Sequence, residues 1–426
     1  MHGRLAGFGL LVMLGWGSAA CAPGARTTPL QAAATATPAA GPRVRPGIDV
    51  LLADSLALVR GRRVGLVTNQ SGVDAAGVGD VERLRAAGVR LVALFSPEHG
   101  FRGAAAPGAA VSSTIDSATG LPIYSLYGRT SAPTDSMLGG VEVLLVDLQD
   151  AGARYYTYLS TTIEVMRAAA RRGIPVVVLD RPDPIGGAVQ GNVLDTAYRT
   201  FVGALAVPMR HGMTLGELAR LARNDLGLAT ALTVVPAAGW RRSMYFDATG
   251  LPFIAPSPNL RTLEALIHYP GTCLFEGTNL SVGRGSEAPF EQVGAPWLDT
   301  AAVLARVRAA RLPGVEFRGV AFTPHAPGDG KYADTLVRGV RLVVTDRARY
   351  DPTRTAVHLL AAVVARHGAP AGELAWLERH FDRLAGTDRL RRALVAGEAP
   401  DRIVDGWAAE LAGFRARRQP FLLYPE

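Results

Sequence analysis

The chain has 426 residues, of which 48% are hydrophobic, and this is enough to bury one large core or two moderate ones. Its formal charge of +8 comes almost entirely from arginine, since Lys331 is the only lysine. No long basic run and no basic stripe interleaved with aromatic residues occurs, so the composition argues against nucleic-acid binding. The two cysteines, Cys21 and Cys273, are too few for a disulfide framework or a cysteine-based zinc site.

The N-terminus is typical of an export signal. Basic residues precede an apolar stretch from Leu5 to Trp16, and small residues then lead to Cys21. This order predicts a lipoprotein signal over residues 1–21 with Cys21 lipidated. Ser18 stands where an apolar residue is usual, so ordinary signal cleavage is the alternative. Both readings predict an exported, periplasmic protein, and in the lipoprotein reading the lipid is its only membrane attachment. Residues 22–46, rich in Ala, Pro and Thr, are predicted to be a linker.

From Gly47 onward, short apolar runs alternate with segments of helical periodicity. Strands are expected over 63–69, 91–95, 141–146 and 175–180, and helices over 80–87, 158–172 and 215–222. Continuous apolar strands separated by helices are typical of a parallel sheet that is covered on both faces. The pattern therefore predicts a Rossmann-like, doubly wound α/β domain over residues 47–236. The glycine-rich fingerprints of nucleotide-binding loops are absent in the right context, so no nucleotide cofactor is expected.

The sequence pattern changes after residue 236. Prolines punctuate the stretch up to Trp297, which is expected to be rich in loops. Helices are then predicted over 300–310, 354–366 and 388–396, and strands over 315–322 and 339–344. We expect residues 237–426 to form a second, smaller α+β domain.

Two of the predicted strands end in acidic and polar residues. Glu98 and His99 follow the strand over 91–95, and Asp147 and Asp150 end the strand that follows it in the predicted sheet. Open α/β sheets place their ligands at this carboxyl edge. These side chains are also a plausible ligand set for Mg²⁺ or Zn²⁺, although no metalloprotease spacing supports a metal site. A metal-dependent hydrolase and a non-catalytic wall-binding protein therefore stay open as alternatives.

A loop in the second half of the chain is dense in functional residue types. It runs from Phe275 to Ser286 and contains three glycines, which allow a close approach of the backbone to a ligand. Glu276 supplies an acid, and Arg284 supplies a guanidinium that can bind a carboxylate with two hydrogen bonds.

Six motifs in this order resemble the NamZ exo-β-N-acetylmuramidases, and the resemblance extends from residue 47 to the C-terminus. The motifs are Gly47 to Asp49, Gly65 to Gly72, Ser96 to Gly103, Asp147 to Tyr158, Asp180 to Pro184 and Phe275 to Gly285. The resemblance implies a Rossmann-like domain, a smaller C-terminal domain and an active-site cleft between them. It also implies that the protein releases N-acetylmuramic acid (MurNAc) from the non-reducing end of peptidoglycan fragments such as MurNAc-GlcNAc oligosaccharides, in cell-wall recycling.

The resemblance implies a role for Glu98, and the chemistry of glycoside hydrolysis suggests roles for further residues. Glu98 matches the family's candidate catalytic acid, and His99 would orient it or the substrate. Glycoside hydrolysis needs a second group, for which Glu276 and Asp147 are candidates together with Asp150. The predicted substrate-binding residues are Asn69, Asp150, Arg154, Tyr155, Tyr156, Asn279 and Arg284. Among them, Arg154 or Arg284 would bind the lactyl carboxylate of muramic acid, and the tyrosines would stack on sugar faces.

Overall fold

The computed structural model describes residues 44–426, which belong to one compact unit. The predicted export signal, Cys21 and the predicted linker up to residue 43 lie outside the described residues. Within the described part of the chain, no helix is long and apolar enough to cross a membrane.

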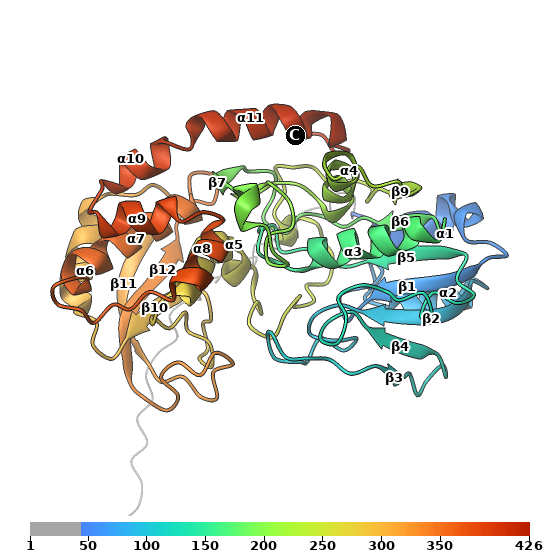
Figure 1. The fold of residues 1–426 in the computed structure, drawn as a ribbon, viewed down its shortest axis with the longest axis horizontal. Coiled ribbons are helices and arrows are strands. Elements are labelled where there is room, and N and C mark those ends of the chain that lie inside the picture. Colours follow the sequence, from blue (N-terminus) through green and yellow to red (C-terminus); the bar gives the residue numbers. More distant parts are fainter. Residues whose placement is uncertain (1–43) are drawn as a thin grey trace, which may run out of the picture. The chain divides into compact units, whose positions relative to one another are not determined.

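A seven-stranded, mostly parallel sheet forms the first half of the structure (Figure 1). Its strand order is β3-β4-β2-β1-β5-β6-β9, and only the edge strand β3 runs antiparallel to its neighbour. The strands are β1 (Arg63–Thr68), β2 (Arg90–Ser96), β3 (Thr114–Ile115), β4 (Pro122–Ser125), β5 (Val143–Asp147), β6 (Val176–Leu179) and β9 (Leu232–Val235). The predicted doubly wound α/β fold is confirmed.

Helices cover both faces of this sheet because alternate residues of each buried strand point to opposite faces. In β5, Val143 and Leu145 join one apolar cluster, whereas Leu144 and Val146 join another. The first cluster includes residues of α1 (Gly47–Asp54) and α2 (Asp80–Ala86). The second includes residues of α3 (Tyr158–Arg171) and α4 (Leu215–Asp225), which together with α1 and α2 flank the sheet in Figure 1.

A separate three-stranded antiparallel sheet forms the core of the second half, in the order β10-β12-β11. Its strands are β10 (Gln292–Ala295), β11 (Val315–Phe322) and β12 (Val337–Val344). The helices of this half are α5 (Leu263–Thr272), α6 (Thr300–Ala309), α7 (Pro352–His367), α8 (Glu378–Ala385), α9 (Arg389–Val395) and α10 (Pro400–Asp405). Helix α11 (Ala408–Arg418) follows them and returns to the first half, where its arginines bond Val189, His211 and Gly212. A two-stranded ribbon of β7 (Gln190–Val193) and β8 (Pro208–Arg210) completes the structure.

The structure adds elements that the sequence pattern did not predict. The stretch expected to be loop-rich contains helix α5 and strand β10. Helix α5 ends in Pro270 and Gly271, two residues that weaken the helical signal of a segment. The fold also begins before Gly47, since Val44 is buried against Trp240 and Tyr424.

The chain order creates a switch point at β1. From β1 the chain passes to β2 on one side and later to β5 on the other. The carboxyl ends of β1 and β5 lie side by side, with Thr68 opposite Asp147. Ligands of open α/β sheets bind at such a point, and the segments after β1, β2 and β5 carry most of the predicted site residues.

Candidate functional site

Glu98 is held at the end of β2 by two hydrogen-bond donors from different segments. The backbone N–H of Gly108 donates to its Oε1 at 2.8 Å, and the Thr157 hydroxyl donates to its Oε2 at 2.7 Å. Thr157 directly precedes helix α3, so the carboxyl group is fixed between a strand end and a helix start. Only 9% of Glu98 is exposed. The side chain therefore has a defined orientation with a small accessible surface.

His99 and Tyr127 flank this carboxyl group. His99 adopts a left-handed backbone conformation, with a φ of 68°, and its Nδ1 lies 2.8 Å from the carbonyl oxygen of Ala105. A carbonyl can only accept, so Nδ1 carries the proton and Nε2 is left as an acceptor. Burial lowers the pKa of His99, and the imidazole is therefore neutral at pH 7. Burial and the neighbouring Glu98 raise the pKa of Tyr127 to about 12, while the positive charge of Arg383 opposes this rise.

Glu276 and Arg284 form an ion pair close to His99. Arg284 Nε lies 2.6 Å from Glu276 Oε1. Burial alone would raise the pKa of Glu276, but the Arg284 guanidinium, with help from Lys331 and Cys273, outweighs burial and the pKa is lowered. Arg284 also contributes to the lowered pKa of His99, so the ion pair lies within electrostatic range of the residue that follows Glu98. Arg284 Nη1 is buried without a hydrogen-bond partner in the described part of the chain, which leaves one donor for a ligand.

Lys331 holds the loop that carries this ion pair. Its Nζ donates to the carbonyl oxygens of Glu276 at 3.2 Å and Leu280 at 3.0 Å. Glu276 and Arg284 are thus held as a pair, and the charge of Arg284 acts on His99, which comes from a distant part of the sequence.

The structure places Asp147 elsewhere. This carboxylate is fully buried and forms an ion pair with Arg181, whose Nη2 lies 3.0 Å from Asp147 Oδ2. Arg181 Nη2 also donates to the carbonyl oxygen of Val73 at 2.7 Å. Through Arg181, Asp147 therefore links the buried ends of neighbouring strands. Asn69 is similarly occupied, because its Nδ2 donates to the Tyr158 hydroxyl at 2.6 Å and its Oδ1 accepts from Ser71.

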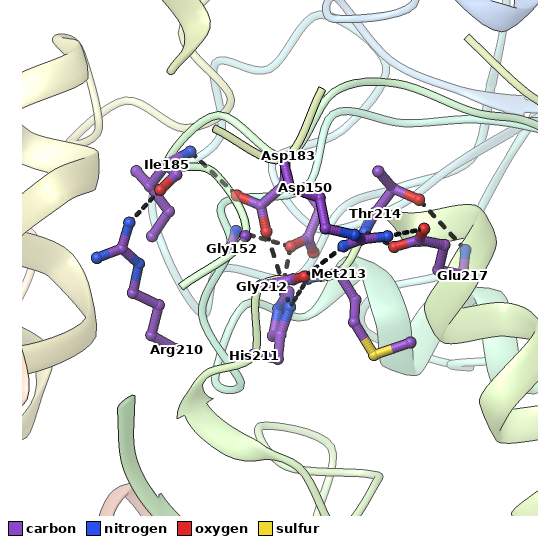
Figure 2. Close-up of polar contacts among 12 residues, drawn as sticks. Asp150, Gly152, Asp183, Ile185, Arg210, His211, Gly212, Met213, Thr214 and Glu217 are labelled. Carbon is purple, nitrogen blue, oxygen red and sulfur yellow. Dashed lines mark hydrogen bonds and ion pairs between the residues drawn. The ribbon is translucent and has the colours of Figure 1, made fainter. Parts of the chain in front are cut away.

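Asp150 belongs to a buried cluster with His211 and Asp183 (Figure 2). The Met213 N–H donates to His211 Nδ1 at 3.2 Å, so the ring proton sits on Nε2, which lies 3.4 Å from Asp150 Oδ2. Asp183 Oδ2 lies 3.8 Å from Nδ1, the unprotonated ring nitrogen. Burial raises the pKa of Asp183 to about 7, although His211 opposes the rise. Asp150 Oδ2 also accepts from the Gly152 N–H at 2.8 Å, so the cluster shapes the turn after β5.

Arg154 is buried and binds only backbone carbonyl groups. Its Nη1 donates to Asn192 at 2.7 Å and Val207 at 3.1 Å, and its Nη2 donates to Leu384 at 2.9 Å and Ala385 at 2.8 Å. Three chain segments are therefore joined by one guanidinium, which has no terminal nitrogen left for a substrate.

The two tyrosines and Asn279 also make contacts within the protein. The buried hydroxyls of Tyr155 and Tyr156 donate to the carbonyl oxygens of Pro270 and Pro256. Asn279 bonds the backbone of residues 373 and 375 through both ends of its amide. These side chains fix the loops around the site.

Sequence reasoning missed three residues near Glu98. Thr157 lies within the motif from Asp147 to Tyr158. Its hydroxyl directly before the predicted helix start could have marked it as a hydrogen-bonding residue. Tyr127 and Arg383 carried no signal, because each lies in a segment with no neighbouring motif, and only the folded chain brings them near Glu98.

A cavity of about 670 Å³ lies on the other side of the turn that carries Glu98. Asn69, Gln70 and Asp80 form its polar walls, and Phe101 and Arg102 come from the turn itself. Among the described residues, no group of three or more His, Cys, Asp or Glu side chains is placed to hold a metal ion.

Comparisons with known proteins agree with this architecture. Residues 64–264 match the model of the N-terminal part of exo-β-N-acetylmuramidase NamZ, and residues 267–424 match the model of its C-terminal part. The chain is 42% identical over 386 residues to the peptidoglycan β-N-acetylmuramidase NamZ of Bacillus subtilis strain 168, covering 90% of this chain and 92% of the relative. Two crystal structures of DUF1343 family proteins from Bacteroides fragilis are similar, with TM-scores of 0.82 and 0.72 and identities of 34% and 31%. Each similarity covers 90% of this chain and 99% of the solved one.

Proposed function

Because the chain belongs to the NamZ family of exo-β-N-acetylmuramidases, we propose that it is a glycoside hydrolase that releases MurNAc from the non-reducing end of peptidoglycan fragments. The single observation that carries the assignment within the structure is the orientation of Glu98 by the Gly108 N–H and the Thr157 hydroxyl. A carboxyl group that is fixed in this way can meet a glycosidic oxygen without first reorganising.

In this proposal, Glu98 protonates the oxygen of the leaving sugar. The Thr157 hydroxyl suits both states of the reaction, because a hydroxyl can donate to an ionised carboxylate and can accept from a protonated one. His99 is neutral and offers Nε2 as an acceptor. It therefore orients a sugar hydroxyl or the protonated Glu98 by accepting a hydrogen bond, and it carries no positive charge that would pair with a carboxylate.

Glu276 takes the complementary role. Arg284 helps to lower the pKa of Glu276, so Glu276 is ionised at neutral pH. A negative charge stabilises the positive charge that develops at the anomeric carbon in the transition state. The unpaired Nη1 of Arg284 supplies a donor for the same sugar.

We further propose that the cavity beside Phe101 receives the part of the glycan beyond the bond that is cleaved. Phe101 is only partly buried and belongs to the same turn as Glu98. Aromatic rings present an apolar face, and this one suits packing against a sugar ring. Arg102, from the same turn, also lines the cavity and supplies hydrogen-bond donors for sugar hydroxyls.

The test is product analysis with a matched pair of variants. The wild-type protein is expected to convert MurNAc-GlcNAc into free MurNAc and GlcNAc, identified by mass. Glu98→Gln should lower kcat by about 10²- to 10⁴-fold, the usual contribution of a general acid. Glu316→Gln, at an exposed position of β11, is the control. Full turnover by Glu98→Gln would refute the role of Glu98, and an inactive wild type would refute the proposed function.

We also propose that the protein is exported to the periplasm and attached to a membrane through a lipid on Cys21. Metabolic labelling with a radioactive fatty acid should mark the wild type and not Cys21→Ala, and Cys21→Ala should move from the membrane to the soluble fraction. An unlabelled wild type in the soluble fraction would favour ordinary signal cleavage instead.

A further inference from the structure

Helix α8 is docked directly on the segment that carries Glu276. Gly277 leaves no room for a side chain, because a Cβ at this position would lie 2.4 Å from the Cα of Phe381 in α8. The Leu377 N–H donates to the Gly277 carbonyl oxygen at 2.9 Å. Close packing therefore fixes the position of α8 relative to the segment that carries Glu276.

The C-terminal end of α8 is fixed to the other side of the site. Arg154 donates to the carbonyl oxygens of Leu384 and Ala385, and Asn192 donates to Ala385 at 2.8 Å. Arg154 stands three residues before Thr157, which holds Glu98. In Figure 1, α8 lies at the edge of the second half that is nearest to the large sheet. Helix α8 is thus tied to both segments that supply the predicted catalytic carboxyl groups.

Two residues one turn apart on α8 form a pair of side chains at this position. Arg383 Nη2 lies 2.6 Å from His380 Nδ1. A guanidinium can only donate, so His380 Nδ1 is unprotonated and accepts. Burial and Arg383 lower the pKa of His380, in agreement with a neutral imidazole. A neutral acceptor orients the guanidinium without cancelling its charge.

Arg383 differs from Arg284 and Lys331, the two cations of the loop that carries Glu276. Arg284 is paired with Glu276, and the Lys331 ammonium donates to two carbonyl groups and has Asp329 nearby. Arg383 is exposed, and in the described part of the chain it forms no ion pair with a carboxylate within 4.0 Å. Its charge nevertheless acts on the Tyr127 hydroxyl, which is also influenced by Glu98. An oriented guanidinium without an acidic partner is suited to bind an anionic group of a ligand.

We propose that Arg383, oriented by His380 on α8, binds the lactyl carboxylate that distinguishes a muramic acid residue from glucosamine. This inference rests on the proposed function, since it assumes that the sugar beside Glu98 is MurNAc. The lactyl ether adds one carboxylate to an otherwise neutral amino sugar, and Arg383 supplies a positive charge without an acidic partner, within electrostatic range of the same tyrosine hydroxyl as Glu98.

The test compares a chromogenic β-MurNAc with the same compound in which the lactyl carboxylate is replaced by its carboxamide. Losing a hydrogen bond to a charged group corresponds to about a 10- to 100-fold change. Arg383→Ala should lower kcat/KM by this factor for the carboxylate substrate, mainly through KM. It should change the carboxamide substrate less than about threefold, because that compound has already lost the charge. Arg383→Lys should recover part of the loss, since it keeps the charge but not the planar fork.

Arg379→Ala is the matched control, because Arg379 is an exposed arginine on the same helix with no hydrogen bond or ion pair to the described residues. It should leave both substrates unchanged. Equal losses on both substrates in Arg383→Ala, or no loss on either, would overturn the assignment of Arg383 while the enzyme remained an active muramidase. A wild type that releases no MurNAc would instead overturn the proposed function itself.

Discussion

Replacing Arg154 by alanine is predicted to destabilise the protein rather than to remove a substrate contact. Four charged hydrogen bonds at about 1.5–3 kcal/mol each give a gross contribution of about 6–12 kcal/mol. Burial lowers the pKa of Arg154 to about 10, which corresponds to a cost of about 3 kcal/mol for the charged form. The net loss in Arg154→Ala is therefore at least about 3–5 kcal/mol, the range found when one partner of a buried charged pair is removed.

Thermal unfolding and hydrogen exchange test this prediction. With an unfolding entropy of about 2.1 cal/mol/K per residue, a loss of about 4 kcal/mol in a protein of this size lowers Tm by about 5 °C. Amides of α8 should lose protection before those of the large sheet, because two of the four carbonyl groups belong to its last turn. Arg171→Ala, at the exposed end of α3, is the control. A Tm within about 1 °C of wild type and unchanged protection of α8 would refute the architectural role.

Three further predictions concern buried groups. Since Asp183 titrates near pH 7 in the folded state and near 3.9 when unfolded, the folded state holds an extra proton between these values. The free energy of unfolding should therefore fall by about 2 kcal/mol from this group as pH rises from 5 to 7. Urea titrations at several pH values should show that the unfolding free energy of Asp183→Asn falls less steeply with pH than that of wild type. An equal dependence on pH in both proteins would count against the raised pKa. Gly277→Ala should lower both Tm and kcat/KM, because the new methyl group displaces Phe381 and with it α8, and wild-type values would contradict the close packing. Burial raises the pKa of the Cys273 thiol, so it should react with iodoacetamide only after unfolding, and fast labelling of the native protein would oppose this.

Much of the fold follows from local sequence pattern. The runs that become β1, β2, β5 and β6 are largely continuous and apolar, whereas those that become β11 and β12 mix apolar with charged residues. Each run is separated from the next by helical periodicity or by turn residues. Short elements were missed for a physical reason. The ribbon strands β7 and β8 have four and three residues, too few for a period to be recognised, and they pair only because the surrounding chain brings them together.

The chain by itself determined which segments gather at the site, because acidic and polar residues at the ends of parallel strands must share one edge of the sheet. It also predicted that Glu98, His99, Glu276 and Arg284 take part in chemistry, and in the structure Arg284 pairs with Glu276 and acts on His99. Only the tertiary structure decided which partners each polar side chain binds. The partners of Arg154 are backbone carbonyl groups, which every residue possesses and which leave no mark in a sequence. For the same reason, only the folded chain could bring Arg383, more than two hundred residues after Glu98, to a position where its charge reaches the same tyrosine hydroxyl.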